Sequence, residues 1–140
     1  MKNPVNSPCY CLMLRRAASS VTDMYDKALA EYGITLNQFS IIINLNNMSM
    51  ATTTELAQQI GLERSTLVRN LKAIMAMGYI ENVSGENERN NHLRVTSSGR
   101  HLLKLTIPVW QSVQDKISES LGSENAALLM DMLYKLQETE

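Results

Sequence analysis

The sequence predicts a mainly α-helical fold that contains one small β-hairpin. Most of the chain has apolar residues at helical spacing between recognisable helix caps, whereas residues 79–95 include segments that read as strands. The chain has 140 residues, of which 44% are hydrophobic and 19% are charged. These proportions are typical of a globular protein, and the length fits one domain, so we expect residues 1–140 to form a single domain.

The first helix is predicted over about residues 8–32. Ser7 can cap it, Pro8 suits the first helical position, and Gly33 ends it. Apolar residues at alternating steps of three and four form one stripe along this helix: Cys11, Leu14, Ala18, Val21, Tyr25, Ala28 and Tyr32. A stripe of this length on a terminal helix often packs on a partner helix.

Three helices are predicted next, over about residues 36–47, 52–60 and 63–77. Thr35 with Gln38 and Thr52 with Glu55 have the spacing of capping boxes, in which each pair satisfies two backbone donors at a helix start. Gly61 separates the second of these helices from the third. After them, residues 79–83 and 92–95 are predicted to form a hairpin around a polar loop.

Two helices are predicted to complete the chain. One spans about residues 98–121 and contains Pro108, which predicts a kink or an early break, because proline removes a helical hydrogen bond. The other spans about residues 124–137 after Gly122, and one of its faces is apolar: Leu128, Leu129, Met132, Leu133 and Leu136.

The order of elements between residues 52 and 96 predicts a winged helix-turn-helix. A short helix, a tight turn, a second helix and a hairpin follow one another, and the second helix of such a unit enters the major groove of DNA. If Leu67, Leu71 and Ile74 face the core, the opposite face carries hydroxyls and cations: Ser65, Thr66, Arg69 and Lys72. A solvated polar face without a partner is the alternative interpretation.

Charge and motifs narrow the function classes. The net charge is -1 and the pI is about 6.1, so a nucleic-acid surface on this chain has to be a local basic patch. No phosphate-binding loop, nucleophile elbow or zinc-protease motif occurs, and we therefore expect no enzyme activity and no cofactor. No segment has the length of a membrane span, and the N-terminus lacks the order of a secretory signal, which predicts a cytoplasmic protein.

Several short motifs occur in a fixed order along the chain: residues 54–57 (TELA), 62–69 (LERSTLVR), 77–80 (MGYI) and 93–96 (LRVT), together with Leu71 and Gly99. In these motifs the sequence resembles the MarR family of bacterial transcription regulators. Further matches lie at 14–18 (LRRAA), 25–26 (YD), 34–35 (IT) and 38–39 (QF), so the resemblance covers about residues 11–136. Each motif alone is weak, but in this order and spacing they are specific together.

The resemblance implies a homodimer that binds a near-palindromic DNA operator, with repression as the commoner mode. Helices over about 8–32 and 98–138 would form the dimer interface around a winged helix at about 36–96. Ser65, Thr66 and Arg69 would contact the groove, Arg64 and Lys72 the phosphates, and Arg89 the minor groove from the wing. Asn87 replaces the family's usual aspartate beside that arginine, and Glu86 and Glu88 make the wing acidic. A winged helix that binds another protein instead of DNA is the alternative.

The resemblance also implies a small aromatic effector between the dimerisation helices and the winged helix. Arg15 and Arg16 could hold a carboxylate, and Trp110 could form an apolar wall. Alternatively, Trp110 belongs to the dimer core and the arginines form ion pairs between subunits.

A thiol sensor is a second implied effector mode. The spacing of Cys11 and Tyr25 is similar to that of one-cysteine peroxide sensors in the family, although Arg15 and Phe39 replace their further tyrosines. Arg15 could lower the pKa of the thiol, whereas an inert small apolar residue is the alternative role of Cys11. Cys9 and Cys11 lie far from His92 and His101 in the sequence, so no metal site is predicted.

Overall fold

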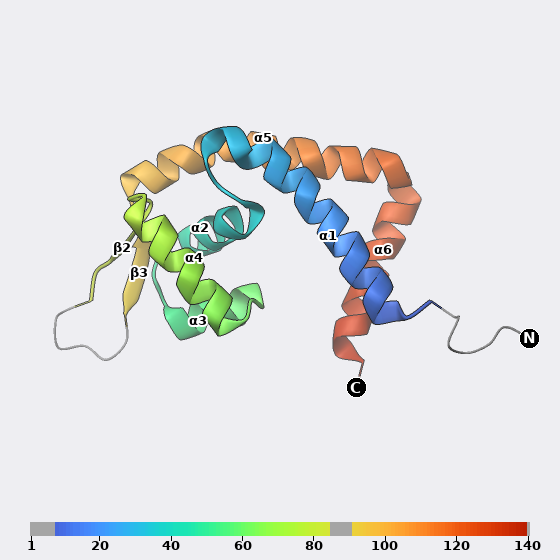
Figure 1. The fold of residues 1–140 in the computed structure, drawn as a ribbon, viewed down its shortest axis with the longest axis horizontal. Coiled ribbons are helices and arrows are strands. Elements are labelled where there is room, and N and C mark those ends of the chain that lie inside the picture. Colours follow the sequence, from blue (N-terminus) through green and yellow to red (C-terminus); the bar gives the residue numbers. More distant parts are fainter. Residues whose placement is uncertain (1–7, 85–90, 140) are drawn as a thin grey trace, which may run out of the picture.

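The computed structural model describes residues 8–84 and 91–139 and consists of two parts that share one long helix (Figure 1). The winged-helix lobe contains α2 to β3 and the first half of α5. The helical arm contains α1, the second half of α5 and α6. Helix α5 runs along the top of the molecule in Figure 1 and connects the lobe to the arm.

Helix α1 spans Tyr10–Leu29, and the 3-10 turn η2 spans Ala30–Tyr32. The helix begins later than predicted, because Cys9 has extended backbone and precedes the first turn; Ser7 lies outside the described residues. Gly33 ends the segment as predicted, in a left-handed conformation with a φ of 75° that glycine adopts without a steric penalty.

Helices α2 (Leu36–Met48), α3 (Thr53–Ile60) and α4 (Arg64–Ala76) form the helical part of the lobe. Both predicted capping boxes are confirmed. The Thr35 backbone N–H donates to the Gln38 side chain at 3.0 Å and the Thr35 hydroxyl accepts from the Gln38 N–H at 3.2 Å, and the Thr52–Glu55 pair repeats this geometry. These bonds fix where α2 and α3 begin.

The sheet has three antiparallel strands, in the order β1 (Ala51–Thr52), β3 (His92–Val95) and β2 (Ile80–Asn82). Ala51 pairs with Leu93, and Ile80 pairs with Val95. The predicted hairpin is therefore confirmed, and a third strand, which the sequence analysis did not predict, joins its edge. A strand of two residues is too short to show an alternating pattern.

The core of the lobe lies between α2, α4, the sheet and the start of α5. The predicted inward residues Leu67, Leu71 and Ile74 of α4 are all buried. They belong to a cluster that also includes Phe39, Ile42, Leu45, Leu56, Leu93, Val95, Leu102 and Leu103. Helix α4 is thereby held with its remaining face toward solvent.

Helix α5 spans Ser97–Leu121 without interruption, and α6 (Ser123–Glu138) follows after Gly122. Of the kink or early break predicted at Pro108, the early break was wrong. Pro108 and Lys104, whose carbonyl loses its helical partner, are both exposed, so water can satisfy that carbonyl while the helix continues. No helix among the described residues has the length and apolar character needed to span a membrane.

The start of α5 makes a close contact with the turn after α4. The Thr96 hydroxyl donates to the Gly78 carbonyl at 2.6 Å and accepts from the Gly99 N–H at 3.0 Å, and the Thr96 N–H donates to the Tyr79 carbonyl at 3.0 Å. A β-carbon on Gly99 would lie 2.3 Å from the Tyr79 carbonyl oxygen and 2.6 Å from Val95 Cγ1. Only glycine therefore fits at position 99.

We expect Gly99→Ala to lower the free energy of unfolding by roughly 1–3 kcal/mol, because overpacking against a backbone oxygen forces the backbone to shift. Alanine is favoured over glycine inside a helix by about 1 kcal/mol. The variant is destabilised only because the cost of crowding exceeds this gain in helix propensity. Urea unfolding of Gly99→Ala measures the effect, and Ser98→Ala, an exposed position in the same turn, is the control. A Gly99→Ala variant as stable as the parent would contradict the close contact.

Candidate nucleic-acid interface

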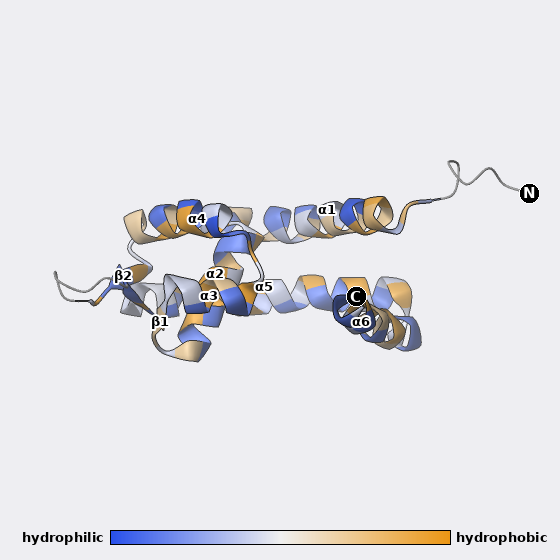
Figure 2. Cartoon of the chain, turned by 90° about the horizontal axis from the view of Figure 1, so that it is seen from below, coloured by the Kyte–Doolittle hydropathy of each residue, from blue (hydrophilic) through white to orange (hydrophobic). Residues whose placement is uncertain are grey.

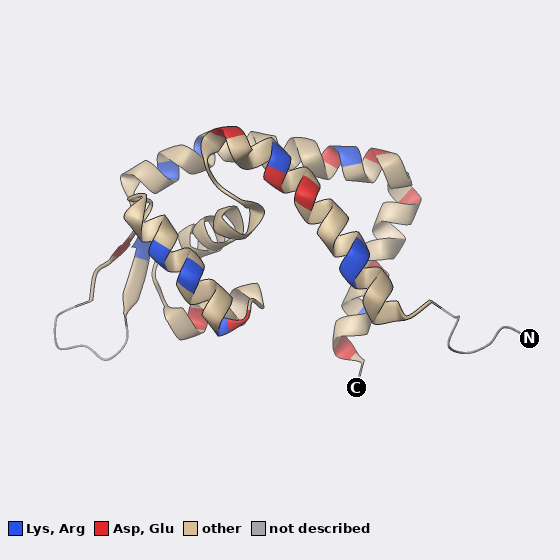
Figure 3. Ribbon diagram, in the orientation of Figure 1, with Lys and Arg blue, Asp and Glu red and all other residues tan. Residues whose placement is uncertain are grey.

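The outward face of α4 carries the polar and basic residues that the sequence analysis assigned to DNA. Arg64, Ser65, Arg69 and Lys72 are exposed, and Thr66 is half-buried. Figure 3 shows where basic residues occur along α4. Because the inward face is fixed by Leu67 and Ile74, both fully buried, the five side chains form one rigidly mounted surface.

Hydrogen bonds between neighbouring side chains orient this face. Arg69 Nη2 lies 3.4 Å from the Thr66 hydroxyl, to which it donates. Arg64 Nη1 donates to the hydroxyl of Thr54, on α3, at 3.5 Å, and thus joins the two helices of the helix-turn-helix. The cations retain further N–H donors, and phosphates and base edges are suitable acceptors for them.

Two residues of this face were missed in the sequence analysis. Thr54 braces Arg64, and Glu63, which directly precedes α4, accepts a hydrogen bond from the Ser65 hydroxyl at 3.1 Å. The run TTTE at residues 52–55 signalled the cap formed by Thr52 but not the contact of Thr54 with α4. That contact depends on the angle between two helices, which local spacing does not encode.

Helix α3 packs against α4 and supports it. Leu56 is fully buried, and Glu55 closes the capping box at the helix start. The hydrogen bond from the Thr52 backbone N–H, followed by that with the Thr52 side chain, lowers the pKa of the Glu55 carboxyl below its ordinary value. The carboxylate therefore keeps its charge at the positive end of the helix dipole.

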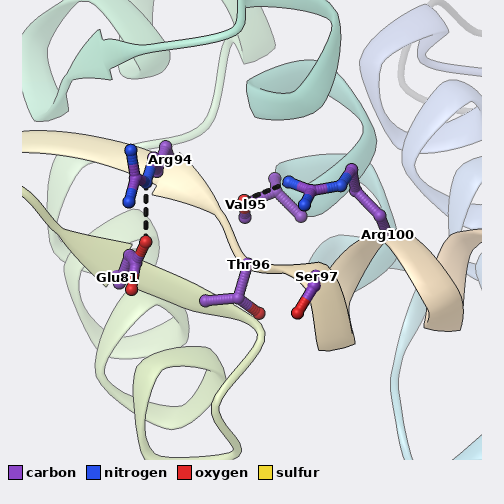
Figure 4. Close-up of a pocket in the computed structure, with 6 residues that line it drawn as sticks. All are labelled: Glu81, Arg94, Val95, Thr96, Ser97 and Arg100. Carbon is purple, nitrogen blue, oxygen red and sulfur yellow. Dashed lines mark hydrogen bonds and ion pairs between the residues drawn. The ribbon is translucent and has the colours of Figure 1, made fainter.

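The base of the wing carries a separate charged cluster. Arg94 Nε donates to Glu81 Oε1 at 2.6 Å across the β2–β3 pair, and Arg100 Nη1 donates to the Val95 carbonyl at 3.0 Å (Figure 4). With Thr96 and Ser97 these residues line a shallow pocket. Arg89, predicted to enter the minor groove, lies outside the described residues together with Glu86, Asn87 and Glu88.

The three predicted effector residues are not brought together within one chain. Arg15 and Arg16 are exposed on the first half of α1, whereas Trp110 is half-buried on α5. The Trp110 ring stacks on Phe39, with centroids 6.0 Å apart and planes inclined by 25°, and thereby packs against the core of the lobe. Across residues 8–84 and 91–139, neither arginine forms a hydrogen bond or cation–π contact with Trp110.

The predicted redox residues are also separate within one chain. Cys11 is exposed, and Arg15 Nη2 lies 3.7 Å from its Sγ. Tyr25 is buried and donates a hydrogen bond to the Gln114 side chain on α5, and burial raises the pKa of its phenol. The two residues are 14 positions apart on one helix, a rise of about 21 Å, so a contact between them would need a second chain. Among the described residues, no cluster of three or more His, Cys, Asp or Glu side chains could hold a metal ion.

The chain is similar to known proteins in sequence and in structure. The MarR family profile matches residues 34–90, which contain the helix-turn-helix. The M. tuberculosis transcriptional regulator MosR, solved in complex with DNA, is 32% identical, with 92% of this chain and 98% of that chain covered and a TM-score of 0.74. NadR, solved in complex with 4-hydroxyphenylacetate, is 25% identical over the full length of both chains, with a TM-score of 0.75.

A curated relative agrees with these structures. The HTH-type transcriptional regulator SarZ of Staphylococcus haemolyticus is 24% identical over 110 residues, which cover 78% of this chain and 72% of SarZ. The outward face of α4, the three-stranded winged-helix lobe and these similarities lead to one conclusion: the chain belongs to the MarR family of winged-helix, DNA-binding transcription regulators.

Proposed function

We propose that two copies of the chain form a cytoplasmic, non-enzymatic dimer that represses transcription by placing its two α4 helices in successive major grooves of a near-palindromic operator. The observation that carries this proposal is the rigidly mounted face of α4, where Arg64, Arg69 and Lys72 accompany two hydroxyls. The DNA complex of MosR supports it, since that protein is 32% identical and has the same fold. Dimers with two-fold symmetry require operators with matching symmetry.

Apolar residues of the helical arm support a dimer. The predicted stripe on α1 is covered only in its second half: Tyr25 is buried, but Cys11, Leu14 and Ala18 are exposed. Helix α6 exposes Leu128, Leu129, Met130, Met132 and Leu136. Figure 2 shows hydrophobic residues on both helices at the end of the molecule away from the wing. An exposed apolar surface of this extent is typical of a protein–protein interface. A second copy of the chain has the same apolar faces on α1 and α6, so the two copies can pack on each other.

We expect the double substitution Leu128→Glu/Met132→Glu to produce a monomer, because two charges would have to be buried in the dimer interface. Their side chains are 55% and 54% exposed in the single chain, so its own fold should tolerate the change. Light scattering coupled to gel filtration measures the mass, and Met50→Glu, at an exposed methionine of the lobe, is the control. A variant that remains dimeric would place the interface elsewhere.

In the proposed complex, Ser65, Thr66 and Arg69 contact base edges, while Arg64 and Lys72 contact phosphates. Arg69→Ala should weaken binding to a selected operator by about 1–3 kcal/mol and relax its specificity at one position. A competition assay on duplexes selected from a random pool measures this. Arg100→Ala, which also removes one cation but lies on α5, is the matched control. Equal operator affinity for Arg69→Ala and the parent would remove α4 from the interface.

Salt dependence separates this proposal from the alternative that the winged helix binds another protein. Contacts between cations and DNA phosphates release counterions, so operator affinity should fall steeply as salt rises. The same series with Lys72→Ala should show a slope that is smaller by about one contact per α4 helix.

We further propose that a small aromatic acid releases the operator by binding between the helical arm and the lobe. NadR in complex with 4-hydroxyphenylacetate supports this ligand class. Trp110 lies where α5 passes from the lobe into the arm, and it contacts the core through Phe39. In a dimer, Arg15 and Arg16 could reach this region from the other copy.

Trp110 is the one tryptophan of the chain, so its fluorescence reports on this region alone. Titration with a panel of aromatic acids that includes 4-hydroxyphenylacetate should give a saturable change and release operator DNA over the same concentration range. Arg15→Ala should weaken both effects, because it removes a charge-assisted hydrogen bond to the carboxylate, typically about 1.5–3 kcal/mol. Trp110 fluorescence that does not change with any acid of the panel would contradict an aromatic pocket in this region.

The contact of Arg15 with Cys11 favours a second candidate, a thiol-based switch. Cys11 is exposed, so a peroxide can reach its sulfur beside the Arg15 guanidinium. If this switch operates, hydrogen peroxide should release operator DNA from the parent and from Cys9→Ser but not from Cys11→Ser. Equal release from both single variants would eliminate Cys11 as the sensor.

A further inference from the structure

The carboxylate of Glu63 lies at the N-terminal end of α4, where the proposed function places DNA contacts. Glu63 precedes the first turn, is exposed, and makes no side-chain cap to its own helix. Among the described residues, the only hydrogen bond of its side chain is the one that Glu63 Oε1 accepts from the Ser65 hydroxyl at 3.1 Å. A carboxylate at this position interacts favourably with the positive end of the helix dipole, but it forms no cap hydrogen bond to the helix.

The pair formed by Glu63 and Ser65 offers only hydrogen-bond acceptors to a ligand. The Ser65 hydroxyl proton is directed to Glu63, which leaves oxygen lone pairs on Ser65 and a second, free oxygen on Glu63. In the major groove, cytosine N4 and adenine N6 are donors, whereas guanine and thymine present acceptors. Adenine also places its N7 acceptor beside N6, which a carboxylate oxygen would repel. Cytosine is therefore the base that fits this pair best.

None of the cations that the structure describes forms an ion pair with this carboxylate. Within the described residues, Glu63 has no ion pair: Arg64 is directed to Thr54 and Arg69 to Thr66. A free negative charge near phosphates is repelled, so a duplex without a suitable donor at this point is disfavoured. The N-terminal end of a recognition helix is the part that approaches the base edges.

We propose that Glu63, supported by Ser65, selects a cytosine in each half-site by accepting a hydrogen bond from its N4 amino group, and that the same charge disfavours other DNA. This inference rests on the proposed function, because it assigns a specificity-determining residue to that DNA interface. The cations of α4 attract any DNA duplex, whereas Glu63 distinguishes among base pairs.

Selection from random duplexes with the full-length protein tests the inference. The parent should select a motif with one strongly preferred C·G pair in each half-site, favoured over other pairs by roughly tenfold or more. E63A should lose the preference at that position alone. E63Q should change it from C·G to A·T, because an amide pairs with adenine N6 and N7. Thermal unfolding of each variant verifies that it is folded.

Two control variants isolate the carboxylate. S65A keeps the carboxylate but removes its hydrogen-bond donor, so it should weaken the cytosine preference less than E63A does. Equal loss in S65A and E63A would mean that Glu63 only positions Ser65. Glu119→Gln removes one negative charge from the exposed surface of α5 and should leave the motif unchanged.

The possible results separate this inference from the function on which it rests. A parent protein that selects no motif would remove the proposed function itself. A parent that selects a motif which E63A and E63Q share unchanged would overturn the role of Glu63 and leave the function intact. Affinity that rises equally for all duplexes in E63A, without a change at one position, would make Glu63 a general repulsive charge and also overturn the cytosine assignment.

Discussion

The contact between the start of α5 and the turn after α4 determines how the parts of the molecule are arranged. Thr96 connects three elements, because its hydroxyl caps α5 and bonds to Gly78 while its N–H bonds to Tyr79. Gly99 permits the close approach that these bonds require. Leu102, Leu103 and Thr106 then bury the first half of α5 in the lobe. Since α5 continues into the arm without a break, the orientations of the arm, the wing and helix α4 are linked.

Helix α1 provides a second connection between the arm and the lobe. The Asp26 carboxylate accepts from the Leu36 N–H at 2.7 Å and so adds to the cap of α2, and Tyr25 bonds to Gln114 of α5. Both contacts lie in the second half of α1, whereas the first half is exposed. One end of this helix therefore packs within the chain, and the other end is exposed. An effector that shifts α1 would act directly on the start of α2 through Asp26.

Local patterns predicted the elements well, and contacts distant in sequence were the part that they could not supply. Thr35 with Gln38, Thr52 with Glu55, and Gly61 fixed helix boundaries because caps and turns depend on adjacent residues. Strand β1 was missed because it exists only through its pairing with β3. The break predicted at Pro108 did not account for the packing of α5 on both sides of the proline. Predicted DNA-contact residues such as Arg69 lie on the expected face of α4. The contact of Thr54 with Arg64 could not be predicted, because it depends on how α3 and α4 are placed.

A chain with a net charge of -1 can bind DNA only if its charges are distributed unevenly, and the described residues show such a distribution. At the base of the wing, Arg94 is compensated by Glu81. On α4, the cations form no ion pair with an acid within residues 8–84 and 91–139, so their fields extend toward solvent. Few cations give a modest attraction to DNA of any sequence, because each phosphate contact contributes its own salt-dependent share. Discrimination among duplexes then depends on base-edge contacts rather than on overall charge. The negative charge of an acid beside those cations lowers the affinity for DNA of any sequence. At the correct base this loss is offset, because the acid accepts a hydrogen bond from a donor on the base edge.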